Sequence, residues 1–111
     1  MDLTKNADYL LSVFYKEYLD RLADGYPKAK ARQFGSPEDI YNTFFAEWSV
    51  DDILETCREL SRAGMIDCFF VSGSFTFAEL TPSAVLYMEQ RFGNKVDKVL
   101  SWMSKIKSAF L

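Results

Sequence analysis

Carboxylates dominate the middle of this chain of 111 residues. The segment 36–80 holds nine acidic side chains against two basic ones, a local balance of −7, and the acids are Glu38, Asp39, Glu47, Asp51, Asp52, Glu55, Glu59, Asp67 and Glu79. Residues 1–35 carry +1 and residues 81–111 carry +3, so the whole chain has a net charge of −3. Dense carboxylates repel nucleic-acid phosphates and attract basic proteins. The middle segment therefore favours a basic protein partner or a mimic of nucleic acid, although a merely solvated helix face explains the same acids.

Other side chains that carry chemistry are few. The chain has no histidine, which excludes imidazole bases, Ser-His and Cys-His pairs and histidine zinc sites. Its two cysteines, Cys57 and Cys68, are too few for a structural zinc site and are expected to be small buried hydrophobes. There is no glycine-rich phosphate loop, and carboxylates on one helix face cannot surround a calcium ion. We therefore expect no enzyme, no catalytic residue, no cofactor and no metal site.

The elements that position these groups belong to one domain, residues 1–111, since 49% of the chain is apolar and 16% aromatic. A first helix is predicted over residues 1–23, capped by Asp2 or Thr4 and ended near Gly25. Its apolar residues recur at three- and four-residue steps: Leu3, Ala7, Leu10, Leu11, Phe14, Tyr18 and Leu22. Residues 26–35 have proline, glycine and no acid, and are predicted to be an exposed basic loop.

Residues 36–64 contain two helix starts. Ser36 precedes a proline and two acids, and Ser49 is followed three places later by Asp52, which are both typical N-terminal signals. The second helix places four apolar residues on one face and ends at Gly64; they are Ile53, Leu54, Cys57 and Leu60. A connection of about four residues makes the two helices cross sharply, as in a helix-turn-helix.

After Gly64 the apolar spacing becomes alternating, so residues 65–80 are predicted to form a β-hairpin with a turn at residues 72–74. Residues 81–111 then form two helices, of which the first carries Val85, Leu86, Met88 and Phe92. The last helix has an apolar stripe formed by Val96, Val99, Leu100, Met103, Ile106 and Phe110. This stripe either docks on the first helix or pairs with its own copy across a two-fold axis, and the homodimer is the preferred alternative.

The order helix, helix-turn-helix, hairpin, helix resembles a winged-helix domain. Leu60-x-x-x-Gly64-x-Ile66 and Leu80-Thr81 are similar to the motifs around the wing of bacterial winged-helix regulators of the PadR type, although residues 65–80 contain no Arg or Lys. A closer likeness, mainly over residues 49–111, is to the YjcQ-like family of small bacterial and phage proteins. It rests on Leu80, Thr81, Tyr87 and the final helix with its lysines 95, 98, 105 and 107. The resemblance implies an α+β fold: a winged helix-turn-helix with two C-terminal helices.

In such proteins the second helix of the helix-turn-helix meets DNA. Here its outward face is centred on Glu55 and Glu59, and i,i+3 pairs with Arg58 and Arg62 are expected on it. In the hairpin, adjacent phenylalanines must point to opposite faces, so at least one needs cover from the C-terminal helices or from another chain. The predicted protein-binding residues are therefore Asp52, Glu55, Glu59, Phe69, Phe75 and Phe77.

Two functions remain open at this point. The first is a non-enzymatic module that acts through protein contacts in a regulatory or phage-related setting. The second is a DNA-binding transcriptional regulator, dimeric through its last helix, which holds phosphates with Lys28, Lys30, Arg32 and Arg62. No stretch approaches the roughly 20 apolar residues that span a bilayer, and the N-terminus does not read as a signal peptide. We therefore expect a cytoplasmic protein without a membrane partner.

Overall fold

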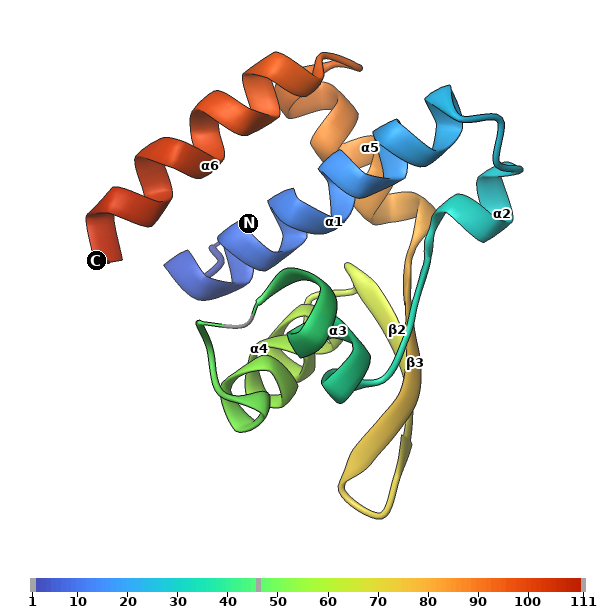
Figure 1. The fold of residues 1–111 in the computed structure, drawn as a ribbon, viewed down its shortest axis with the longest axis vertical. Coiled ribbons are helices and arrows are strands. Elements are labelled where there is room, and N and C mark those ends of the chain that lie inside the picture. The colour runs from blue at the N-terminus through green and yellow to red at the C-terminus, as the bar shows by residue number, and fades with distance from the viewer. Residues whose placement is uncertain (1, 46, 111) are drawn as a thin grey trace.

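The computed structural model describes residues 2–45 and 47–110, and the side chains among them up to residue 108. This part of the chain is an α+β fold of six helices and one three-stranded antiparallel sheet (Figure 1). In chain order the elements are α1 (Lys5–Ala23), α2 (Lys28–Ala31), β1 (Gln33–Phe34), α3 (Pro37–Phe44), α4 (Val50–Arg62), β2 (Ile66–Val71), β3 (Ser74–Leu80), α5 (Pro82–Phe92) and α6 (Val96–Phe110).

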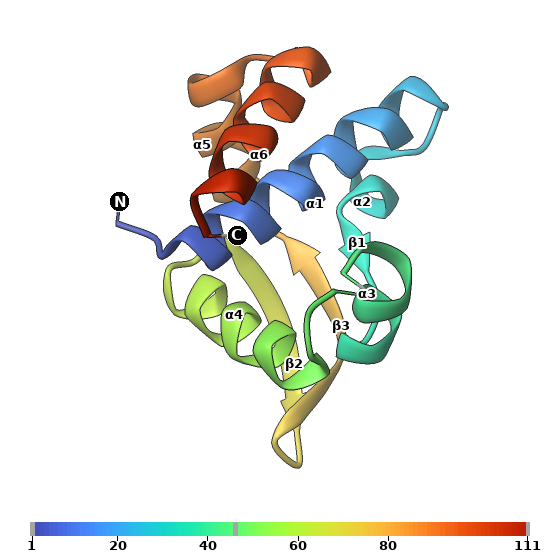
Figure 2. The same ribbon diagram turned by 60° about the vertical axis from the view of Figure 1, so that its left-hand side comes forward.

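Helix α1 runs through the centre of the molecule. The Thr4 hydroxyl caps it by accepting a hydrogen bond from the Ala7 N–H at 3.3 Å, and Gly25 beyond its end has a φ of +91°. Helix α4 packs on one side of α1, and α6 packs on the other (Figures 1 and 2). Because α1 is covered on both sides, it contributes more buried apolar residues to the core than any other described element, with Leu10, Leu11, Phe14 and Tyr15 fully buried.

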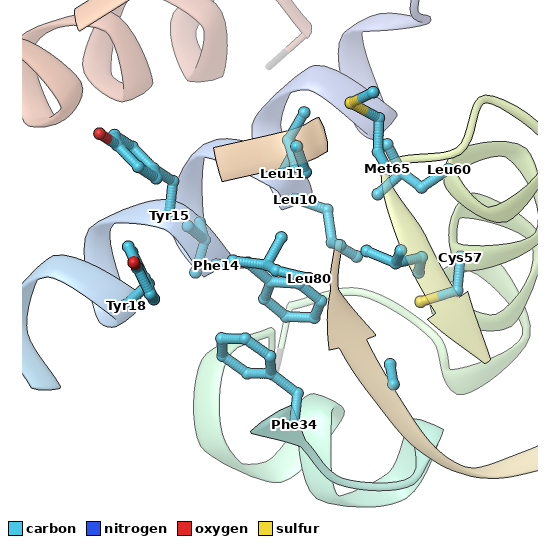
Figure 3. Packing of buried hydrophobic residues seen from close by; sticks show 14 of the residues in the cluster. Leu10, Leu11, Phe14, Tyr15, Tyr18, Phe34, Cys57, Leu60, Met65 and Leu80 are labelled. Carbon is cyan, nitrogen blue, oxygen red and sulfur yellow. The ribbon is translucent and has the colours of Figure 1, made fainter. Parts of the chain in front are cut away.

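The prediction of an exposed loop at residues 26–35 is wrong. The segment forms the short helix α2 and the strand β1, which pairs antiparallel with β3 through Gln33 opposite Glu79 and Phe34 opposite Ala78. The Phe34 side chain is only 4% exposed and stacks on Phe14 with 3.9 Å between ring centroids (Figure 3). A strand of two residues has no periodicity to read, so only the contact with β3 and α1 reveals it.

The predicted starts of α3 and α4 are confirmed. Ser36 and Asp39 form a capping box, and the Ser49 hydroxyl accepts a hydrogen bond from the Asp52 N–H at 3.0 Å. Helix α4 buries Ile53, Cys57 and Leu60, as its apolar face predicts, while Leu54 is half-buried.

The hairpin β2–β3 is also confirmed, but its turn has two residues. Ser72 and Gly73 have φ angles of +52° and +83°, and Ser74 already pairs with Val71. Between the pairs Cys68–Ala78 and Phe70–Phe75, strand β3 contains one residue more than β2. This bulge reverses which face the following side chains occupy.

Helices α5 and α6 lie on the side of α1 that faces away from the hairpin (Figure 1). The Thr81 hydroxyl caps α5 by accepting from the Ala84 N–H at 3.0 Å. Met88 and Phe92 of α5 are buried, whereas Leu86 is exposed.

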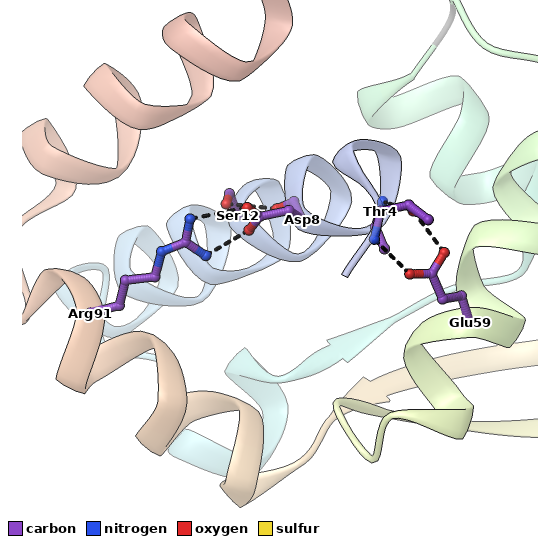
Figure 4. Close-up of polar contacts among 6 residues, drawn as sticks. Thr4, Asp8, Ser12, Glu59 and Arg91 are labelled. Carbon is purple, nitrogen blue, oxygen red and sulfur yellow. Dashed lines mark hydrogen bonds and ion pairs between the residues drawn. The ribbon is translucent and has the colours of Figure 1, made fainter. Parts of the chain in front are cut away.

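Arg91 connects the C-terminal helices to α1. Its guanidinium donates two hydrogen bonds to the Asp8 carboxylate, at 2.6 and 3.0 Å (Figure 4), and lies over the Trp102 ring at 4.5 Å. Burial opposes the charge of Arg91, but the hydrogen bonds and the charge of Asp8 outweigh it, so the pKa of Arg91 is raised. One side chain thus holds α1, α5 and α6 together.

Substitution Arg91→Met is therefore expected to lower the free energy of unfolding by about 1–3 kcal/mol, because it leaves the largely buried Asp8 carboxylate without its partner. Urea unfolding followed by circular dichroism measures the loss. Arg62→Met, at an exposed position near the end of α4, is the matched control and should change stability by no more than about 0.5 kcal/mol. Equal effects of the two substitutions would contradict the prediction.

Candidate functional site

The acidic side chains of α4 occupy its solvent-facing side. Asp51, Asp52 and Glu55 are exposed, so three carboxylates stand on the first two turns of this helix. Asp51 and Asp52 follow the Ser49 cap, where the positive end of the helix dipole stabilises negative charge. The predicted contact residues Asp52 and Glu55 therefore do lie together on one accessible surface.

Glu59, the third predicted contact on α4, has a partner inside the chain. Its carboxylate accepts a hydrogen bond from the Thr4 N–H at 2.9 Å and another from the Thr4 hydroxyl at 2.7 Å (Figure 4). It thereby fastens the start of α1 to α4, across 55 residues of sequence. The expected pair with Arg62 is not the contact that the structure shows for this carboxylate.

Arg58 connects α4 to the tip of the hairpin. Its guanidinium donates to the Gly73 carbonyl at 2.7 Å and lies 5.1 Å from the centroid of the Phe70 ring. The expected pair of Glu55 with Arg58 is thus replaced by a contact that holds the hairpin against α4. Glu55 remains an exposed carboxylate beside this junction.

The outer face of the hairpin presents an apolar surface. Phe69 is 64% exposed and Phe77 is 45% exposed, and their places next to the inward-facing pair Cys68–Ala78 put both on the face directed away from the helices. Val71 is half exposed on the same strand as Phe69, and sequence reasoning had not selected it. Neither α5 nor α6 covers this face, because both lie beyond α1 (Figure 1).

Phe75, the remaining predicted contact residue, points into the core. It is 3% exposed and packs edge-to-face against Phe70, with ring centroids 5.8 Å apart. The β3 bulge turns Phe75 into the core, and no pattern of alternation in the sequence reveals that bulge. The structure therefore brings together Phe69 and Phe77, and separates Phe75 from them.

The basic residues of the alternative DNA hypothesis are dispersed. Lys28 and Lys30 are exposed on α2, at the opposite end of α1 from α4 (Figures 1 and 2), and Arg32 lies 4.0 Å from the Glu79 carboxylate. Arg62 is exposed near the end of α4. These four cations do not form one continuous basic surface.

The apolar stripe predicted for dimerisation is largely used within the chain. Val99 and Ile106 are buried in the packing of α6, Val96 and Met103 are half-buried, and Leu100 is exposed. The side chain of Phe110 lies outside the described residues. A dimer through this stripe as a whole would require α6 to leave α1.

The two cysteines lie side by side between α4 and β2. Cys57 is buried, Cys68 is half-buried, and their thiols share a hydrogen bond. The pKa of Cys57 is raised, first by this hydrogen bond and then by burial, so its thiol stays neutral. Cys57 is therefore a buried packing residue between α4 and β2.

No family model, curated protein or solved structure is detectably similar to this chain. Among the described residues, no helix combines the length and the apolar character needed to cross a membrane. The molecule offers two exposed surfaces for contact with a partner: the acids of α4 and the outer face of the hairpin.

Proposed function

We propose that this protein is a non-enzymatic winged-helix module that acts through protein–protein contacts in a regulatory or phage-related role. The element order supports the winged-helix part: α1, then α3 and α4 at the place of the helix-turn-helix, then β2–β3 at the place of the wing. In this assignment α4 is the helix that would read DNA.

One observation carries the protein-contact part of the proposal: Phe69 and Phe77 form an uncovered aromatic pair on the outer face of the wing. Exposed aromatic side chains that gather in one place mark contact surfaces in soluble proteins. The exposed acids of α4 form a second surface, suited to a basic partner and unsuited to phosphates. Both surfaces therefore favour protein over DNA as the binding partner.

The wing is tested by placing a photo-crosslinking amino acid at Val71, beside the aromatic pair, and comparing crosslinks in the native host cell. Phe69→Ser with Phe77→Ser is expected to abolish the specific crosslinked bands. The matched control is Leu86→Ser with Leu100→Ser, which removes two exposed apolar side chains from α5 and α6. Loss in both double variants, or in neither, would contradict a contact through the wing.

The DNA alternative is tested by fluorescence anisotropy of a random duplex in about 50–200 mM salt. We expect no binding even at the lowest salt concentration, because α4 presents carboxylates to the duplex. Binding that weakens with a log–log slope of several units, and that Lys28→Glu with Lys30→Glu abolishes, would instead establish the DNA-binding regulator.

A further inference from the structure

A cavity of about 450 Å³ lies where the N-terminal half of α1 meets the connection between α3 and α4. Its volume is within the range of small-molecule sites. Tyr9, Phe45 and Trp48 supply aromatic walls, Glu47 and Asp52 supply carboxylates, and Lys107 reaches the rim from α6. This cavity is separate from the wing and shares only Asp52 with the acidic surface of α4, so an inference from it does not depend on the wing contact proposed above.

The aromatic walls are closely packed. The ring centroids of Phe45 and Trp48 are 4.8 Å apart, and Tyr9 lies 5.9 Å from Phe45 and 6.1 Å from Trp48. Tyr9 and Trp48 are only half-buried, so parts of their surfaces face the cavity. The face of an aromatic ring carries negative electrostatic potential and attracts organic cations.

The charged groups of the cavity also favour a cationic ligand. Two carboxylates border it, and the C-terminal end of α3 in the same wall adds the negative end of a helix dipole. The N-terminus of α4 adds positive potential from its helix dipole. The charges of Asp51 and Asp52 offset this potential, and the Ser49 hydroxyl accepts a hydrogen bond from one of the free N–H groups. The cavity as a whole therefore favours positive charge.

The chain already places an alkylammonium group at this rim. The Lys107 Nζ lies 3.7 Å from a Glu47 carboxylate oxygen, and both side chains are substantially exposed. An exposed pair of this kind contributes little stability, so another cation can replace Lys107 at small cost. The Lys107 ammonium thus shows that this rim accepts an alkylammonium group, and it would compete with any other cation that binds there.

These groups exclude other ligand classes. Two carboxylates repel phosphates and other anions, and the described residues contain no group of three or more His, Cys, Asp or Glu side chains that could hold a metal ion. We propose that the cavity binds a compact organic cation, an ammonium or guanidinium group enclosed by Tyr9 and Trp48 and paired with Asp52. The cation comes either from a free small molecule or from a basic side chain of another protein.

Choline and its uncharged isostere 3,3-dimethyl-1-butanol test the proposal at constant ionic strength. In ¹H–¹⁵N NMR spectra, choline is expected to shift the indole N–H signal of Trp48 saturably, while that of Trp102, outside the cavity, stays in place. The isostere should bind at least about fivefold more weakly, because it lacks the charge. Equal shifts by both compounds, or none by choline and none by N-acetyl-lysine methylamide, would overturn the proposal.

Three variants test which charged side chains affect choline binding. Asp52→Asn is expected to weaken choline binding about threefold or more, and Lys107→Met to strengthen it by removing the competitor. Asp51→Asn is the matched control, because it removes the same charge from the same helical turn but Asp51 does not line the cavity. Equal weakening by Asp51→Asn and Asp52→Asn would overturn the proposal. Tighter binding of N-acetyl-lysine methylamide than of choline would identify a protein side chain as the source.

Discussion

Substitution Phe34→Ala is expected to lower the free energy of unfolding by about 3–5 kcal/mol, the usual cost of removing a buried phenylalanine ring. Phe34 stacks on Phe14, contacts Phe44 with 6.1 Å between ring centroids, and lies 4.7 Å from the Arg21 guanidinium carbon. Alanine leaves a cavity between α1 and the sheet and removes the anchor of β1. A domain of this size has a stability of about 5–15 kcal/mol, so the loss is a large fraction of the total.

Urea unfolding monitored by circular dichroism measures this change, and Tyr26→Ala is the control. Tyr26 belongs to the same connecting segment but is 49% exposed, so its removal should cost no more than about 0.5 kcal/mol. If residues 26–35 were a solvated loop, both substitutions would be equally mild. A mild effect of Phe34→Ala would therefore contradict the docking of β1.

Alkaline pH is expected to destabilise the fold through Tyr15. The Tyr15 hydroxyl donates to the Gly93 carbonyl at 2.7 Å, and burial, followed by the charge of Glu89, raises the pKa of Tyr15 from 10.0 to about 12. Between these values the unfolded chain releases the phenolic proton while the folded chain keeps it. The free energy of unfolding should fall by about 1.4 kcal/mol for each pH unit in this interval, and Tyr15 should contribute no pH dependence below it.

Unfolding free energies measured between pH 8 and about pH 12 test this prediction. Burial also raises the pKa of the neighbouring Tyr18, so Tyr15→Phe should reduce the alkaline slope without removing it. Tyr26→Phe, at an exposed site, should leave the slope unchanged. The slope is the decisive quantity, since Tyr15→Phe also loses a hydrogen bond and lowers stability at every pH.

Local signals in the sequence determined much of the secondary structure. Ser36 and Ser49 each begin a helix as predicted, and Thr81 begins α5 in the same way, because a capping side chain bonds to a backbone N–H only three residues away. The change from helical to alternating spacing after Gly64 likewise predicts the hairpin. The acidic surface of α4 follows from the same local periodicity, since Asp52 and Glu55 lie opposite its apolar face.

Contacts between residues far apart in the sequence decided the rest. Strand β1 exists through pairing with β3, some 45 residues later, and the β3 bulge buries Phe75 while it exposes Phe77. The packing of α1 on α4 brings Glu59 within hydrogen-bond distance of Thr4. The packing of α6 on α1 buries Val99 and Ile106. The aromatic cavity combines residues of α1, of α3 and the segment that follows it, of α4 and of α6, which no local pattern connects. A sequence specifies its local bonds directly, whereas which surfaces stay exposed depends on how the elements pack.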